Sequence, residues 1–229
     1  MSTPSNGNPK RETKGVSGRQ RILETAYDLF THEGINKVGI DTVLAESGAA
    51  KMTLYRNFRT KEDLALAVLD LRQERWTFGW LRAEVLERTQ DAHQRLLSIF
   101  DLFDEWFHQA DFTGCPFIRA LLESEPGSTI HAACGHHLRL IGDFVAELAS
   151  DADIPDTAAF GRIWHILMKG AIVDAYGGNL KAAAEAKRAA SVVLRHWTIP
   201  PAAKHAQRSG ARPKKKAVIK RGRAASGNS

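Results

Sequence analysis

The sequence predicts an all-α protein with a small N-terminal head of three helices and a larger helical body. Apolar residues recur at helical spacing through most of the chain between residues 17 and 201. β-Branched residues nowhere alternate with polar ones over a useful length, so no strand is expected. Residues that favour helix ends separate the apolar segments. These three observations define the expected fold class.

The head is expected to begin at Ser17. Ser17 and Gln20 have the spacing of a capping box, in which the serine side chain accepts a hydrogen bond from a backbone N–H three residues on. Gly34 suits the left-handed backbone that ends a first helix. Two short helices are then expected at about 41–47 and 51–58.

The body is expected to open with a long helix that has Thr60 as its N-cap and bends near Gly79. Asn179 is expected to open the last helix, and Pro200 and Pro201 close the folded part. The body helices after the first are expected at about 91–109, 116–125, 129–151, 156–176 and 179–197.

The charges divide the chain into an acidic centre and two basic ends. Residues 1–21 carry five Lys or Arg and one Glu, and residues 202–229 carry nine Lys or Arg and no acidic residue. Since the whole chain has a formal net charge of +6, residues 22–201 carry a formal charge of −7. Basic ends on an acidic body favour a polyanionic partner.

The segment GINKVGIDTVLAESGAAKMTLYRNFRTKEDL has the pattern of a helix-turn-helix, in which Gly48 ends the first short helix and permits the tight turn. Val43 and Leu44 are spaced to pack the first helix inward, and Leu54 and Phe58 do the same for the second. The residues left outside on the second helix combine cations, hydroxyls and an apolar side chain, as a DNA-recognition helix requires. They are Lys51, Met52, Thr53, Tyr55 and Arg56.

This segment resembles the DNA-binding signature of the TetR repressors, which ends in a Thr-x-Tyr-x-x-Phe-x-x-Lys-Glu run. The resemblance covers about residues 17–70, and beyond residue 70 only the helix pattern matches. It implies a ligand-released repressor that binds a palindromic double-stranded DNA operator as a homodimer. The residues that match the run in order and spacing are Thr53, Tyr55, Phe58, Lys61 and Glu62. The expected DNA-contacting residues are Arg19, Thr42, Lys51, Met52, Thr53, Tyr55, Arg56 and Lys61.

Two departures from the family pattern concern phosphate contacts and capping. Val38-Gly39 stands where many members carry Thr or Ser, so the hydroxyl contact to phosphate is expected to pass to Thr42. Ala49-Ala50 replaces a common Val-Ser, so the recognition helix is expected to lack an N-cap side chain.

The last two expected helices each carry a stripe of small and apolar residues. Small residues allow helices to approach closely, as they do in the four-helix interface of a dimer. We expect this interface, and the alternative is that both stripes pack within one chain. The stripes are Ile163, Leu167, Gly170, Ala171 and Asp174 on one helix, and Ala183, Ala186, Ala190, Val193 and Trp197 on the other.

The body is rich in aromatic residues and poor in charges along its apolar faces, which favours a pocket for a small apolar or aromatic effector. The family resemblance together with apolar spacing places the expected lining residues. They are Phe103, Trp106, Cys115, Phe117, His137, Trp164 and Met168.

The chain is therefore expected to have four parts, of which the two ends lack hydrophobic periodicity. The tail is expected to add sequence-independent attraction to DNA. The parts are a disordered basic arm at 1–16, a helix-turn-helix DNA-binding domain at 17–63, a helical effector-binding and dimerisation domain at 64–201, and a disordered basic tail at 202–229.

Three alternatives remain open. Cys115 near a helix N-terminus suits a thiol-responsive regulator of the same fold. A metal-responsive regulator would use the cluster His131, Cys134, His136 and His137, but 136 and 137 diverge on a helix, so no metal or other cofactor is expected. An architectural nucleic-acid-binding protein would use the basic tail, which leaves the helical body without a role.

Several classes of protein are not expected. The sequence has no phosphate loop, nucleophile elbow or paired carboxylates, so an enzyme is not predicted. No stretch reaches the length of a membrane span, and the first thirty residues hold no apolar signal core. Two cysteines cannot form a disulfide framework. A cytoplasmic location without membrane contact is expected.

Overall fold

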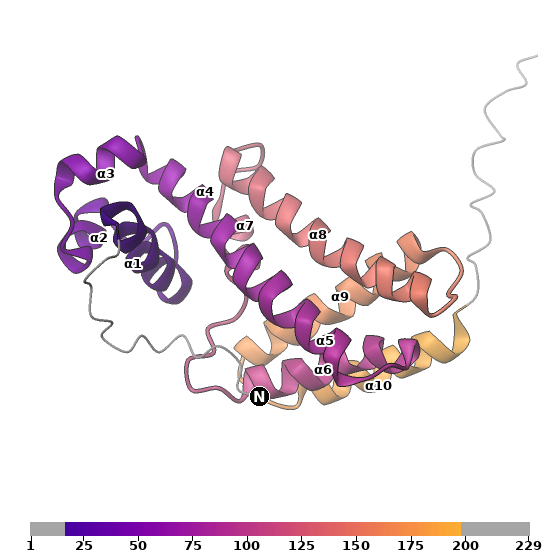
Figure 1. Cartoon of the computed structure of the whole chain (residues 1–229). Coiled ribbons are helices and arrows are strands. Elements are labelled where there is room, and N and C mark those ends of the chain that lie inside the picture. Colours follow the sequence, from indigo (N-terminus) through magenta and orange to yellow (C-terminus); the bar gives the residue numbers. More distant parts are fainter. Residues whose placement is uncertain (1–16, 198–229) are drawn as a thin grey trace, which may run out of the picture. The chain divides into compact units, whose positions relative to one another are not determined.

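The computed structural model describes residues 17–197, and every regular element in this range is a helix (Figure 1). The expected all-α fold class is confirmed. The basic arm expected at 1–16 and the basic tail expected at 202–229 lie outside the described residues.

Three helices form the head: α1 (Gly18–His32), α2 (Ile40–Ser47) and α3 (Lys51–Asn57). The Ser17 side chain accepts a hydrogen bond from the backbone N–H of Gln20 at 3.2 Å, as expected. The Gln20 side chain donates to Glu24 instead of to the cap, so only half of the capping box forms. Gly48 ends α2 in the left-handed conformation, with φ of 60°.

The next helix, α4 (Lys61–Arg72), belongs to the head and to the body at once. Its expected N-cap is confirmed, because the Thr60 hydroxyl accepts from the Asp63 backbone and the Asp63 carboxylate accepts from the Thr60 backbone. The first two turns of α4 pack into the core of the head, and α1 to α3 gather around them (Figure 1). The buried residues of this core include Ile22, Val43, Leu54, Phe58, Leu64 and Val68.

The chain continues from α4 without a break into the π-helix η1 (Gln73–Arg82) and then α5 (Ala83–Arg88). A bend was expected near Gly79, and the structure has instead a ten-residue change of helix type around that glycine. In a π-helix the backbone N–H groups bond five residues back, which is rare and concentrated at functional sites. The residues of η1 that are buried are Gln73, Trp76, Thr77, Trp80 and Leu81.

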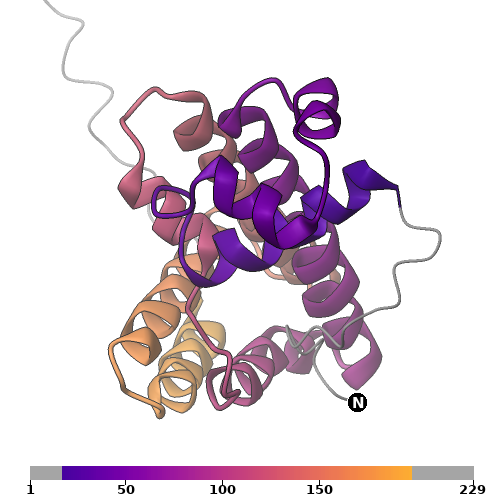
Figure 2. The same ribbon diagram turned by 90° about the vertical axis from the view of Figure 1, so that its left-hand side faces the viewer.

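Five further helices complete the body. The helix α8 packs against α7 and α9, while α10 lies against α6 and α9 (Figures 1 and 2). The bounds are α6 (Ala92–Phe107), α7 (Pro116–Glu123), α8 (Thr129–Asp151), α9 (Thr157–Tyr176) and α10 (Ala182–His196).

The last helix begins three residues later than expected. The expected start, Asn179, lies in a turn in which its amide donates to Asp174 at 2.6 Å and to Glu185 at 3.0 Å. The Asn179 side-chain oxygen accepts from the Lys181 backbone, so this residue stabilises the turn before α10.

Aromatic rings dominate the body core, and their centroids lie 5.0–6.4 Å apart in a connected network. Close approach of α8 and α9 adds to this core. A Cβ at Gly161 would lie 2.9 Å from the Gly142 carbonyl oxygen, so the crossing of these two helices requires a glycine.

The two stripes expected to form a dimer interface are only partly exposed. The α10 stripe is intramolecular core, because its alanines let α10 approach α6 and α9 within the same chain. On α9, Ala171 is also buried, while Ile163 and Gly170 are exposed. The exposed apolar face of α9 is therefore rotated from the expected one, and it comprises Ile163, Ile166, Gly170, Val173 and Tyr176.

Within residues 17–197, no helix has the length and apolar character that crossing a membrane requires.

Candidate functional site

The helix α3 presents one buried face and one exposed face. Leu54 and the following Phe58 are buried in the head core, as expected. Lys51, Met52, Tyr55 and Arg56 are exposed, and Thr53 is half-buried. The Thr53 methyl group lies 2.7 Å from the position that a Cβ on Gly18 would take, so α1 holds this side chain in place.

The other expected DNA-contacting residues surround α3 in the head. Arg19 of α1 is exposed, and its guanidinium lies 5.2 Å above the Phe58 ring. Thr42 is exposed on α2, and Lys61 is half-buried at the start of α4. The N-cap of α3 is Ala50, which provides no side-chain hydrogen bond, as expected. This fold and the exposed face of α3 define a helix-turn-helix DNA-binding protein.

The seven expected effector residues lie in or against the core of the body. Six of them are buried, and Cys115 is half-buried. Phe103 contacts Trp106 at 5.8 Å between ring centroids, and Phe100 links Phe103 to Trp164. Ring contacts therefore link three members of the set, while Phe117 and His137 stack on each other in a different contact.

Buried polar groups of the body were missed by sequence reasoning. Gln73 and Thr77 are buried, and the Thr77 hydroxyl donates to the Gln73 side-chain oxygen at 3.3 Å. Gln73 Nε2, Trp164 Nε1 and His137 Nδ1 have no hydrogen-bond partner among the described residues. The sequence did contain a signal for them. Gln73 and Thr77 are four residues apart, so they share a helix face, and Trp76 and Trp80 lie on that same side.

Burial controls the titration of the body histidines. Burial lowers the pKa of His137, and attraction to the Asp70 carboxylate only partly offsets that change. Burial, together with repulsion from the nearby Lys169, lowers the pKa of His165 to about 4. Both side chains are therefore neutral near pH 7.

The two cysteines are poor candidates for a thiol switch. Burial raises the pKa of the Cys115 thiol, and burial with repulsion from Cys115 raises that of Cys134 to about 12. Since the thiolate is the reactive form, both groups are unreactive near pH 7. No group of three His, Cys, Asp or Glu side chains within residues 17–197 is arranged to hold a metal ion.

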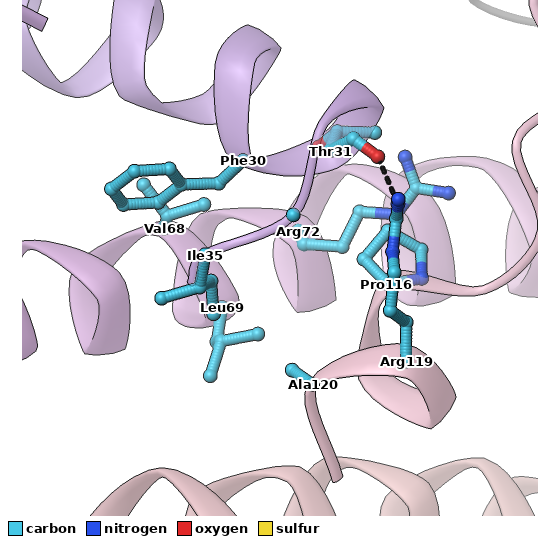
Figure 3. Close-up of a pocket in the computed structure, with 10 residues that line it drawn as sticks. Phe30, Thr31, Ile35, Val68, Leu69, Arg72, Pro116, Arg119 and Ala120 are labelled. Carbon is cyan, nitrogen blue, oxygen red and sulfur yellow. Dashed lines mark hydrogen bonds between the residues drawn. The ribbon is translucent and has the colours of Figure 1, made fainter. Parts of the chain in front are cut away.

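A small pocket lies where the head meets the body, and none of the seven expected effector residues lines it (Figure 3). Its volume is about 10 Å³, room for about one water molecule. Arg119 of α7 crosses this junction and donates to the backbone carbonyl groups of Thr31 and His32 at the end of α1. The lining residues are Phe30, Thr31, Gly34, Ile35, Val68, Leu69, Arg72, Pro116, Arg119 and Ala120.

Comparisons with known proteins identify the family. The sequence profile described as bacterial regulatory proteins, tetR family, matches residues 22–68. SCO4454, a TetR-family transcriptional regulator from Streptomyces coelicolor, is 30% identical, and the match covers 78% of this chain and 94% of that one with a TM-score of 0.67. The chain therefore belongs to the TetR family of transcriptional regulators, which are DNA-binding proteins and not enzymes.

Two further matches agree with this assignment. The regulator QacR from Staphylococcus aureus is 27% identical over 90 residues, which cover 39% of this chain and 48% of QacR. The chain thus spans about half the length of this curated relative. A cysteine mutant of the TetR-family regulator CifR, complexed with 26-bp operator DNA, has the same fold, with a TM-score of 0.64, 19% identity, and coverage of 82% of this chain and all of that one.

Proposed function

We propose that this regulator is a repressor that binds a palindromic operator as a homodimer and leaves it when a small apolar or aromatic effector binds in the helical body. The exposed face of α3 carries the proposal, because it offers cations, hydroxyls and a methionine to a major groove. The CifR structure supports it, since a chain of the same fold is bound there to operator DNA.

The proposed DNA contacts divide into two kinds. Lys61 and Tyr55 are assigned to phosphate, with Arg19 and Thr42 at the edge of the interface. The side chains assigned to base edges are Lys51, Met52, Thr53 and Arg56.

The DNA contacts can be tested with an operator selected in vitro from random DNA. Lys61→Ala should weaken binding to every sequence equally and reduce the slope of log affinity against log salt by about one. Arg56→Ala should instead relax the preference at one base pair by about 1–3 kcal/mol. Arg139→Ala removes an exposed cation on α8 and serves as the control, with no expected change. Unchanged binding in both head variants would contradict the assignment.

The homodimer is supported by the exposed apolar face of α9. Its five members follow the spacing i, i+3, i+7, i+10 and i+13, so they form one continuous stripe on the helix. Stripes of this kind on a protein surface mark sites of association. Two half-sites about one turn of DNA apart also require a twofold partner.

The effector site is supported by two buried donors, Gln73 Nε2 and Trp164 Nε1, and one buried acceptor, His137 Nδ1, none of which has a partner within residues 17–197. The ligand must bind the released state more tightly than the DNA-bound state, since equal affinity shifts nothing. A metabolite library, screened for release of labelled operator DNA, would identify it. Trp106→Ala should then lower effector affinity and leave operator binding intact. Cys115→Ser, which removes the thiol, should still release operator DNA when the effector binds, which would rule out a thiol switch.

A further inference from the structure

Arg72 is a buried cation without an acidic partner. Only 5% of its surface is exposed, and no carboxylate within residues 17–197 lies within 4.0 Å of its guanidinium. Its contacts are neutral: the Tyr27 hydroxyl at 3.2 Å and the Trp76 ring at 5.5 Å. A guanidinium stays charged in proteins, and buried charges are normally paired. Arg72 therefore lacks the counter-charge that its burial requires.

A second cation lines the same pocket. Arg119 comes from α7, and Figure 3 shows its side chain and that of Arg72 reaching toward the end of α1. Glu123 is the acidic side chain near Arg119, and it makes no ion pair with either guanidinium. Burial raises the pKa of the adjacent Cys115 thiol, and both arginines partly offset that rise, so both positive charges act on this spot.

The rest of the pocket lining is mostly apolar. Phe30, Ile35, Val68 and Leu69 form an apolar wall opposite the arginines (Figure 3). Low polarity strengthens the attraction between a guanidinium and an anion. The volume of about 10 Å³ has room for about one oxygen-sized group, so one oxygen of an oxyanion would enter the pocket and the rest of the molecule would lie outside it.

We propose that this pocket binds the oxyanion group of a small carboxylate or phosphate ligand, with Arg72 as the buried anchor and Arg119 as the second donor. The remainder of the ligand lies outside the pocket. This site is separate from the effector site proposed in the body, and the anion proposal does not depend on that effector site. Because Arg72 belongs to α4 and Arg119 binds the end of α1 from α7, the bound anion ties the head to the body at this junction.

Thermal unfolding of the full chain without DNA tests this site. Sodium phosphate and sodium acetate are each titrated against sodium chloride at matched ionic strength and pH 7. At least one oxyanion should give a saturating rise in Tm, on the order of 5 °C near a hundredfold excess over its Kd, and chloride should not. A rise with phosphate alone assigns a phosphoryl ligand, and a rise with acetate assigns a carboxylate.

Arg72→Gln should abolish the rise. Arg88→Gln, which removes an arginine paired with Glu105 on the body surface, should retain it. An equal rise in Arg72→Gln would place the anion elsewhere and overturn the proposal, as would the absence of any rise in the wild type. If Arg72→Gln does not fold, an NMR titration of the wild-type chain takes the place of this variant, with the side-chain Nε–Hε resonance of Arg72 as the signal. This resonance should shift as the oxyanion saturates the protein, and a fixed resonance overturns the proposal.

Discussion

His137 Nε2 lies 3.3 Å from the Asp70 carboxylate, and this pair joins α8 to α4. The His137 ring also stacks on Phe117 of α7, with the centroids 5.0 Å apart. One buried imidazole therefore touches three helices, of which α4 extends into the core of the head. Its neutral form is part of this packing, because burial lowers its pKa.

Stability should fall as the pH is lowered from 7 to 5. The folded-state pKa values of His137 and His165 lie below the unfolded value, so the unfolded chain binds more protons in this window. With a pKa of about 4, His165 should account for about 2 kcal/mol of the loss. Urea unfolding of His165→Asn at both pH values checks this, since the variant should lose less than the wild type by that amount. Equal losses would contradict the assignment to His165.

Gly161→Ala should destabilise the protein by about 1–3 kcal/mol, because the added methyl group would meet the Gly142 carbonyl at 2.9 Å. The matched control is Gly135→Ala on α8. A Cβ there meets only the end of the Arg139 side chain, at 3.5 Å, so alanine should be neutral or stabilising. The denaturant concentrations at the unfolding midpoints of the two variants test this prediction. Similar midpoints would mean that α8 and α9 are not in close contact.

Ile166→Asp should convert the proposed dimer to a monomer. The Ile166 side chain is 57% exposed within the apolar face of α9, and a carboxylate there would be buried without a partner in the dimer. Leu122→Asp on α7 is the control, since Leu122 is 79% exposed and lies outside that face. Light scattering coupled to size exclusion reports the mass, and a dimeric Ile166→Asp would exclude this interface.

Thr60→Ala should lower the free energy of unfolding by about 1 kcal/mol, because the N-cap of α4 loses its side-chain acceptor. It should also weaken operator binding, because Lys61 follows directly on this cap. Glu62→Ala changes an exposed residue of the same turn that takes no part in the capping box. Chemical unfolding and DNA titration measure both effects, and Thr60→Ala should lower stability and operator affinity more than Glu62→Ala does.

The head could be predicted from the sequence almost to the residue. Its helix ends depend on local hydrogen bonds, and Ser17, Gly48 and Thr60 occupy these ends as expected. The face of α3 followed from the same local periodicity. Local rules are sufficient where a short helix has one buried side.

The body was less predictable because its features depend on distant partners. Nothing in the residues around Gly79 distinguishes a π-helix from a bent α-helix. Small residues such as Ala183 and Ala190 suit packing within a chain as well as between chains, and here they serve the former. Arg72 and Arg119 are far apart in sequence, so only the tertiary structure brings both to one pocket.

The π-helix η1 has a consequence for the direction in which the head points. Each residue of an α-helix turns the chain by about 100° around the helix axis. Because the N–H groups of a π-helix bond five residues back, each of its residues turns the chain by less than that. A homologue with η1 of the same length but with α-helical hydrogen bonds would keep every residue of α3 and present them on a different side of that axis. The hydrogen-bonding pattern of this segment therefore sets the angle by which the exposed face of α3 is rotated about the helix axis relative to the body. A change in that pattern would alter this angle while the residues of the head and of the body stay the same.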